Sequence, residues 1–274
     1  MATEQVRARA LGTAPPAGGG APSVLEYLLV VWRRTFRGSL ISSFLTPLLY
    51  LAAMGYGLGA LVDRGTSGGI DGVAYVAFIA PGVLAATAMQ TASGECTYPV
   101  LGAIKWNGQF HAMLATPLRP RQVLAGHVAY LVARFLVVCG VFLVVAALLG
   151  ATPAWTTPLA LPAAVLTGLA FATPITALAA RVEDGGDSFN VLFRFVVMPM
   201  FLFSGTFFPI DQLPGWLQPV AWATPLWHGV ELCRGLTLGT GTAAGAVGHV
   251  AYLLVFVAVG WVLAERALTK RLVS

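Results

Sequence analysis

The sequence has 274 residues, of which 57% are hydrophobic and 10% are charged, and its mean hydropathy is +0.79. Soluble domains carry about 25% charged residues, so this composition excludes an ordinary soluble enzyme or binding module and indicates an integral membrane protein. The net charge of +5 is not accompanied by a basic cluster with interleaved aromatic residues, so it does not indicate nucleic-acid binding.

The N-terminal region divides into a tail and an amphipathic segment. Residues 1–23 are rich in Ala, Gly and Pro and have too little apolar content to offset the entropy of ordering, so we expect a disordered cytoplasmic tail. In residues 24–38, Glu26, Arg33 and Arg37 share one helical face, which predicts an interface helix lying on the membrane surface. The arginines of this segment equally fit the basic flank of a first span: Arg33, Arg34 and Arg37.

Long uncharged stretches divide the rest of the chain, and each can supply the roughly 20 apolar residues of a membrane span. Pro47 would kink the first span and Pro81 would bend the second. We therefore predict an all-α integral membrane domain over residues 24–274 with six transmembrane helices. Their approximate ranges are 39–62, 72–94, 123–149, 158–180, 191–208 and 244–264.

The basic residues predict how this domain is oriented. With a cytoplasmic N-terminus, every Lys and Arg except Arg64, Arg134 and Arg234 falls in a segment predicted to lie inside. Because loops on the cytoplasmic side are enriched in Lys and Arg, this distribution predicts a multi-pass protein of the plasma membrane with both termini in the cytoplasm.

The segment SGTFFPIDQLPGWLQPVAWATPLWHG, residues 204–229, places four prolines and three tryptophans in apolar sequence. A continuous helix cannot accept so many prolines, because each removes a backbone donor and clashes with the preceding turn. Tryptophan favours the membrane interface. The segment predicts a re-entrant helical hairpin on the outer side, between the fifth and sixth spans. Its characteristic residues are Pro209, Asp211, Pro214, Trp216, Pro219, Trp222 and Pro225.

The stretch LFSGTFFPIDQLPGWLQPVAWATPLWHGVELCRG resembles the C-terminal signature of the membrane subunits of type-2 ABC exporters. The stretches YVAFIAPGVLAATAMQ and FHAMLATPLRPRQVLAGHVAY are similar to the branch that contains nodulation protein J and daunorubicin-type drug efflux permeases. The similarity covers roughly residues 25–268. It implies a permease subunit that pairs with itself or with a sister permease and docks two separate ATP-binding subunits.

The chain contains no G-x-x-x-x-G-K-[ST] phosphate loop, so it has no motif of that kind for binding ATP. We therefore expect a transport subunit that is not itself an enzyme and holds no cofactor, with ATP and Mg²⁺ on the partner ATPase. The four histidines show no metal-ligand spacing, so no metal site is predicted.

In permeases similar to this one, the loop after the second span carries a short coupling helix that fits a groove on the ATPase. The resemblance implies such a helix around Trp106–Leu114. An alternative is that Trp106, Phe110 and Met113 only pack this helix onto the membrane domain. The interface helix would be a second contact, with either the ATPase or anionic lipid head groups. The candidate coupling residues are Lys105, Trp106, Gln109, Phe110 and His111, and those of the interface helix are Glu26, Arg33, Arg34 and Arg37.

Candidate residues for a pathway or gate lie within and at the ends of the spans. Arg134 falls within the third predicted span, where ionisable groups are costly and usually functional, whereas Arg194 fits a charge at the boundary of the fifth. Arg134 equally fits a boundary residue that extends its charge to the interface, and Glu95 has the same ambiguity. Glu231 and Arg234 are spaced to pair on one helix. The apolar candidates, which would equally serve helix packing, are Phe78, Met89, Phe201 and Phe208.

Taken together, these patterns predict the permease subunit of an ATP-driven exporter that moves an amphipathic or lipid-linked substrate out of the cytoplasm. Drugs, lipo-oligosaccharides, polysaccharides and lipids all remain open as substrates. The alternative is an ion-coupled secondary transporter, which would need a carboxylate or another ion site well inside a span, and none is predicted here. A membrane scaffold without transport activity is a third possibility, and the elaborate outer hairpin disfavours it.

Overall fold

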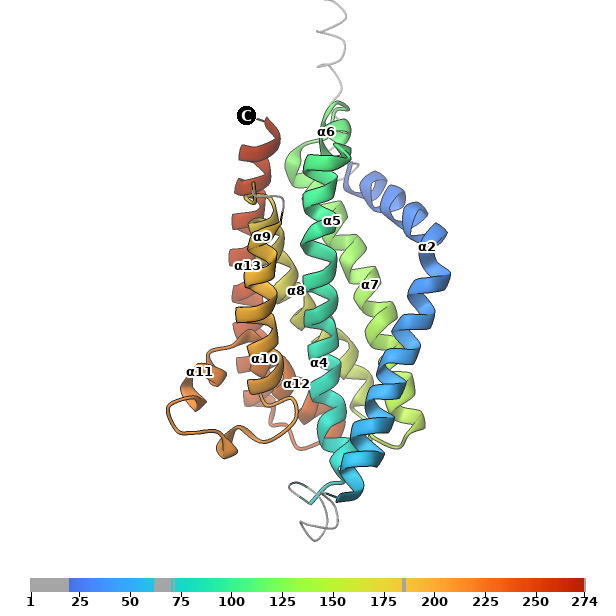
Figure 1. Ribbon diagram of the computed structural model, residues 1–274, viewed down its shortest axis with the longest axis vertical. Coiled ribbons are helices and arrows are strands. Elements are labelled where there is room, and N and C mark those ends of the chain that lie inside the picture. The colour runs from blue at the N-terminus through green and yellow to red at the C-terminus, as the bar shows by residue number, and fades with distance from the viewer. Residues whose placement is uncertain (1–19, 62–69, 71, 184–185, 274) are drawn as a thin grey trace, which may run out of the picture.

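The computed structural model describes residues 20–61, 70, 72–183 and 186–273, without the side chains of residues 35–48 and 56. These residues form a bundle of helices that run along the longest axis of the molecule (Figure 1). The described residues contain no strand apart from an isolated bridge between Ile70 and Val73. The predicted all-helical class is confirmed.

The N-terminal helix, α2, spans Gly20–Tyr50 and continues into the π-helix η1, Leu51–Leu58. The predicted interface helix and first span are therefore one continuous helix, whose first part runs at an angle to the rest (Figure 1). The tail was predicted to end at residue 23, but α2 begins at Gly20. Residues 1–19 lie outside the described part. The helix continues through the expected boundary because its sequence has no helix breaker between 23 and 46 except Gly38.

In the next part of the chain, α4 and α7 follow the predicted second and third spans, with bounds that differ by two or three residues at most. Pro120 opens α7, where the side chain of Gln122 accepts a hydrogen bond from the backbone N–H of Arg119, in a capping box. Proline is favoured at this first position because its missing N–H has no intrahelical partner there. The helices of this part are α4, Tyr75–Cys96; α5, Tyr98–Leu101; η2, Gly102–Trp106; α6, Gln109–Leu114; and α7, Pro120–Leu148.

The second half of the bundle begins after the turn at 149–156. The helical run predicted at 191–208 begins earlier, at Asp187, and ends at Phe203, because Gly205 adopts a positive φ of 77° and turns the chain. The elements are η3, Thr157–Leu159; α8, Ala160–Ala179; α9, Asp187–Leu192; η4, Phe193–Val197; α10, Met198–Phe203; η5, Ile210–Gln212; α11, Gln218–Trp222; α12, Pro225–Leu238; and α13, Ala243–Val273.

Among the described residues, four helical runs are long and apolar enough to cross a membrane. They correspond to the second, third, fourth and sixth predicted spans. The predicted fifth span is represented by the shorter run from Asp187 to Phe203, which contains Arg194. The predicted first span overlaps the short apolar helix Leu51–Leu61. The four runs are Tyr75–Trp106, Pro120–Leu148, Thr157–Ala179 and Ala243–Val273.

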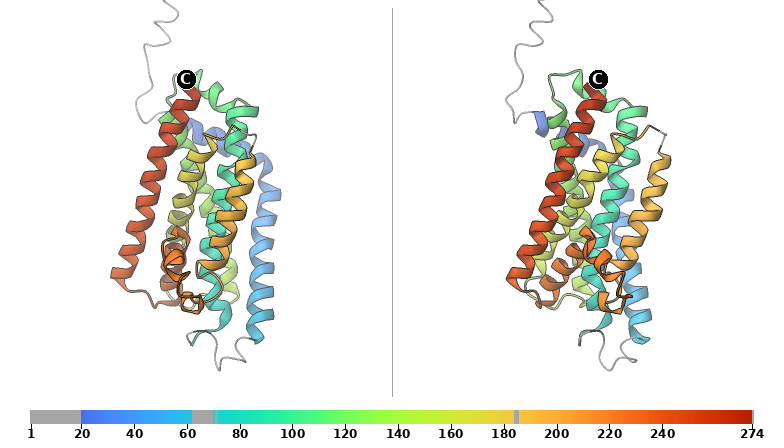
Figure 2. Two further views of the ribbon diagram at one scale, coloured as in Figure 1. Left: turned by 60° about the vertical axis from the view of Figure 1, so that its left-hand side comes forward. Right: turned by 90° about the vertical axis from the view of Figure 1, so that its left-hand side faces the viewer.

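The connections between the helices lie at the two ends of the bundle. One end carries the start of α2, helix α6 and the C-terminal end of α13, and we call it the α6 end (Figures 1 and 2). The other carries the turns at 149–156 and 239–242 and the segment 204–224, and we call it the hairpin end. In the left view of Figure 2, α13 and the long part of α2 stand on opposite sides of the bundle.

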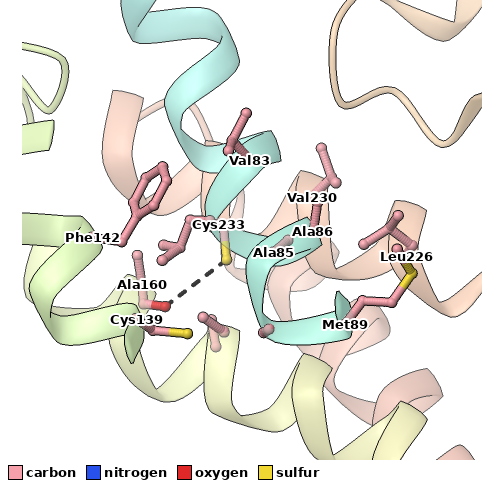
Figure 3. Close-up of a cluster of buried hydrophobic side chains, with 14 of the residues drawn as sticks. Val83, Ala85, Ala86, Met89, Cys139, Phe142, Ala160, Leu226, Val230 and Cys233 are labelled. Carbon is pink, nitrogen blue, oxygen red and sulfur yellow. Dashed lines mark hydrogen bonds between the residues drawn. The ribbon is translucent and has the colours of Figure 1, made fainter. Parts of the chain in front are cut away.

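The buried core lies where α4, α7, α8 and α12 meet. Figure 3 shows side chains from all four helices in one cluster, with the Cys233 thiol directed at the carbonyl oxygen of Ala160, 3.9 Å away. Many of the core residues are alanines, which let the helices approach closely. The labelled members are Val83, Ala85, Ala86, Met89, Cys139, Phe142, Ala160, Leu226, Val230 and Cys233.

One close approach joins the core to the hairpin end. A Cβ atom on Gly82 of α4 would lie 2.6 Å from the carbonyl oxygen of Thr206, which belongs to the turn after α10. Both partners at this contact are backbone, so neither can move aside as a flexible side chain could. The absence of a side chain at Gly82 therefore positions the hairpin segment against α4.

We predict that Gly82→Ala destabilises the protein by about 1–3 kcal/mol, the usual cost of inserting an extra methyl group into a packed core. Thermal unfolding of the purified chain in detergent micelles measures this loss. Gly94→Ala is the matched control in the same helix, because a Cβ there meets nothing within 4 Å. It should be neutral or stabilising by about 0.5–1 kcal/mol. Equal unfolding temperatures for the two variants would contradict the proposed contact.

Candidate functional site

The predicted coupling segment is divided into two short helices. The π-helix η2 ends at Trp106, and α6 begins at Gln109 after Gly108, which has a positive φ of 60°. The predicted continuous helix over Trp106–Leu114 is therefore wrong at its start. Glycine adopts this left-handed conformation without the steric cost of a Cβ, which explains why the break falls there.

The structure separates the five predicted coupling residues by exposure. Trp106 is 58% exposed and His111 is also exposed, whereas Phe110 is buried, with its ring centroid 6.2 Å from that of His127. The Lys105 ammonium donates a hydrogen bond of 2.8 Å to the carbonyl oxygen of Glu183, in the turn after α8. Phe110 thus packs α6 onto the bundle, and Trp106 and His111 remain on the surface.

The predicted interface residues lie on the outer side of α2. Glu26, Arg33 and Arg34 are exposed, and the side chain of Arg37 lies outside the described ones. The opposite side of the helix packs on α7, where Val24 is buried so closely that a Cβ on Gly126 would lie 2.5 Å from the Val24 Cβ. The first part of α2 therefore has one packed face and one exposed face, on which Arg33 and Arg34 lie beside exposed apolar side chains.

Arg134 lies at the middle of α7 and pairs with Glu95 at the end of α4. Its Nη2 and Nε atoms donate to Glu95 Oε1 at 2.7 and 3.0 Å, and the Tyr130 hydroxyl lies 3.4 Å from Oε2. The guanidinium carbon is also 5.4 Å from the ring centroid of Trp32 on α2. The two side chains are only 13% and 22% exposed. The Arg134 side chain thus points inward to a carboxylate. The alternative from the sequence, in which it extends to the membrane interface, is not what the structure shows.

A cavity of about 280 Å³ lies beside this ion pair. Its walls come from α2, α4, α6 and α7, together with α5 and η2, so it joins elements that are far apart in the sequence. It brings Glu95 and Arg134 together with Gln109 and Phe110 of the predicted coupling set. The other polar or aromatic lining residues are Trp32, His127 and Tyr130.

Three of the four prolines of the hairpin segment lie at the start of a short helix. Pro219 and Pro225 lie in the first turns of α11 and α12, where a missing N–H costs nothing, and Pro209 precedes η5. Thr224 caps α12 by accepting a hydrogen bond from the Trp227 backbone N–H at 3.2 Å. The side chains of Asp211, Pro214, Trp216, Pro219 and Trp222 are exposed, whereas Pro225 is buried.

Arg234 of α12 holds the start of the hairpin segment. Its Nη1 atom lies 2.6 Å from Glu231 Oε1, which confirms the predicted pairing. Its Nη2 atom donates to the carbonyl oxygen of Gly205 at 2.6 Å, and the guanidinium carbon lies 4.1 Å from the ring centroid of Phe78. One buried cation therefore connects α4, α12 and the turn after α10.

The apolar pathway candidates lie in different surroundings. Phe78 and Met89 are buried in the core. Phe201 is half-buried and packs edge-on against Phe207, with ring centroids 5.0 Å apart. Phe208 packs on the small apolar cluster of the hairpin. None of the four lines the cavity beside Glu95 and Arg134, and their role in a pathway stays a prediction.

The structure brings together two histidines that the sequence did not predict to be neighbours. His228 of α12 and His249 of α13 face each other with their Nδ1 atoms 2.8 Å apart, and Tyr252 stacks on His228 at a ring distance of 3.7 Å. The two histidines come together only because α12 packs on α13 after the turn at 239–242. Among the described residues, no group of three or more His, Cys, Asp or Glu could hold a metal ion.

We predict that Glu95 and Arg134 are energetically coupled. Glu95→Ala and Arg134→Ala should each destabilise the protein, because each leaves a poorly solvated charge without its partner. The double variant should lose less than the sum, with a coupling energy of about 1–3 kcal/mol from thermal unfolding in micelles. Arg271 and Glu183 form a control pair at 2.7 Å, in which Glu183 is 78% exposed. Its coupling should stay below about 1 kcal/mol. Equal coupling in the two pairs would refute the prediction.

Comparisons with known proteins agree with this architecture. A family described as "ABC-2 type transporter" matches residues 25–238. Nodulation protein J from Rhizobium leguminosarum bv. viciae is 32% identical, over 96% of this chain and 98% of its own. The bv. trifolii protein is 34% identical over 89% and 90%, and that of Rhizobium meliloti (strain 1021) is 32% identical over 89% and 90%. Together with the apolar helices, these matches make the chain a multi-pass membrane protein, and it belongs to the ABC-2 type transporter family.

Proposed function

We propose that this chain is the permease subunit of an ATP-driven exporter, which works in the plasma membrane with two copies of a separate ATP-binding subunit. A second permease, identical or related, completes the transporter. The substrate is an amphipathic or lipid-linked molecule that leaves from the cytoplasmic side. ATP and Mg²⁺ are held by the partner and not by this chain.

The observation that carries the proposal is the surface at the α6 end. Trp106 and His111 are exposed there on short helices that are fixed to the bundle from beneath by Phe110. An exposed tryptophan on an anchored helix is typical of the centre of a protein interface, where tryptophan often supplies much of the binding energy. Family membership supports an ATP-binding cassette subunit as the protein that covers this surface.

In this proposal, the positions of the basic residues set the orientation of the chain in the membrane. Lys105, Arg181 and Arg271 lie at the α6 end, and the start of α2 adds Arg33 and Arg34. Because basic residues favour the cytoplasmic side, the α6 end and both termini face the cytoplasm and the hairpin end faces outward. The anionic inner leaflet would attract the exposed side chains of Arg33 and Arg34 on α2.

The hairpin segment is proposed to dip into the outer leaflet as a re-entrant structure, with α2–η1 and the run from Asp187 to Phe203 completing six spans. Trp216 and Trp222 are exposed at the hairpin end, where indole rings suit the depth of the lipid head groups. The irregular backbone there is partly satisfied within the protein, for example by Arg234 at Gly205. This arrangement suits a cover over an outer opening.

We predict that Trp106→Ala lowers ATP turnover by the assembled transporter at least about tenfold. Loss of a central interface tryptophan commonly costs 2 kcal/mol or more, and about 1.4 kcal/mol already changes an equilibrium tenfold. Co-purification with the ATP-binding subunit and ATP hydrolysis in proteoliposomes measure the effect.

Trp155→Ala is the matched control, because Trp155 is 89% exposed but lies in the turn at the hairpin end. It should leave both the complex and ATP turnover unchanged. If the Trp106 and Trp155 variants behave alike, the α6 end is not the docking surface.

We also predict the sidedness of two introduced thiols. The native Cys96, Cys139 and Cys233 are buried, so a membrane-impermeant maleimide should leave the parent protein unlabelled. In intact cells the reagent should label Gly215→Cys and not Asn107→Cys, whereas inverted vesicles should give the opposite result. Both positions are exposed in the structure. Labelling of Asn107→Cys from outside would overturn the orientation.

A further inference from the structure

We propose that the cavity beside Glu95 and Arg134 binds the uncharged, hydroxyl- or amide-bearing head group of an amphiphile. This inference rests on the proposed export function, and it adds a location, a set of contacts and a charge class for the bound molecule. The site lies within one subunit, between α2 and the helices α4, α6 and α7.

The first support is an unsatisfied polar atom in the cavity wall. The His127 side chain is 6% exposed, and its Nε2 atom has no hydrogen-bond partner among the described residues. Leaving such a group unpaired costs about 1–3 kcal/mol, and native proteins contain few of them. The His127 ring lines the cavity while its Nε2 atom is covered, so a bound molecule would supply the missing hydrogen bond after a small turn of the ring.

The second support is the charge balance of the wall. Glu95 and Arg134 neutralise each other through two short contacts to one carboxylate oxygen. They are the only Asp, Glu, Lys or Arg among the described lining residues. A charged head group would therefore enter a poorly solvated cavity without a free counter-ion, which is costly. An uncharged group can bond to Glu95 Oε2, Gln109 and His127 without that cost.

The third support is the shape and access of the cavity. Its volume of about 280 Å³ is slightly below the usual range of small-molecule pockets, about 300–1,000 Å³, so it suits a single ring and not an oligomer. Trp32 and Phe110 supply flat apolar surfaces. Val31 of α2 lines the cavity and is 47% exposed, so the cavity lies close to the surface along α2.

The site would also connect the head group to the partner-facing surface. Gln109 and Phe110 line the cavity and belong to α6, whose His111 points to the surface. A molecule that binds Gln109 would thus contact the same short helix that the ATP-binding subunit is proposed to touch. Occupancy of the cavity and docking of the partner would then affect one another.

The experiment uses the full chain in lipid nanodiscs and radiolabelled octyl glucoside, an uncharged amphiphile with one sugar ring, below its micelle concentration. Saturable binding of about one molecule per chain is expected. Octyl phosphate and octyltrimethylammonium should not compete. Binding that never saturates, or equal competition by either charged amphiphile, would overturn the proposal.

Two variants test the site itself. His127→Leu removes the unpaired nitrogen and should weaken binding at least about tenfold, while an apolar side chain in this buried position should leave thermal stability equal or higher. Ala103→Leu keeps every polar group but fills the cavity, and should also weaken binding. The control Ala112→Leu changes an exposed position of α6 and should bind as the parent does.

Unchanged affinity in both cavity variants would refute the site. Co-purification with the ATP-binding subunit is measured separately on the same samples, so the two proposals can fail independently. Loss of the complex with intact octyl glucoside binding would reject the exporter role alone. An intact complex without saturable binding would reject the cavity site alone.

Discussion

The constraint on which this structure depends is that lipid hydrocarbon offers no partner to a charge or to an unpaired backbone group. Arg134, at the middle of α7, meets Glu95 and the face of Trp32. Arg234 meets Glu231, the Gly205 carbonyl and the face of Phe78. In each case a cation that would be costly in lipid meets a carboxylate and also contacts groups from other elements, so the need to satisfy it helps to fix how those elements pack.

The same constraint explains which parts of the fold could be predicted from the sequence. Long uncharged stretches located α4, α7, α8 and α13, because a span must be continuously apolar whatever it packs against. Helix ends were less accurate, since charged residues can extend a helix beyond the bilayer, as α13 does to Val273. The division between interface helix and first span failed because amphipathicity changes within α2 without any residue that ends the helix.

Site residues were harder to predict, because their roles depend on contacts between distant segments. The sequence singled out Arg134 and Glu95 separately, but nothing in their 39-residue separation indicated that they pair. His228 and His249 meet only through the packing of α12 on α13. The prolines of the hairpin segment were informative, since proline is tolerated at few places, and Pro219 and Pro225 indeed open short helices.

The turn after α8 joins three parts of the α6 end through a single residue. The Glu183 carbonyl accepts from Lys105 of η2, and its carboxylate pairs with Arg271 near the end of α13. Both links are exposed to solvent, and surface pairs of this kind contribute at most about 1 kcal/mol. Because each link is weak, both can break at a small cost in free energy. The α6 end can therefore rearrange while the alanine-rich core stays intact.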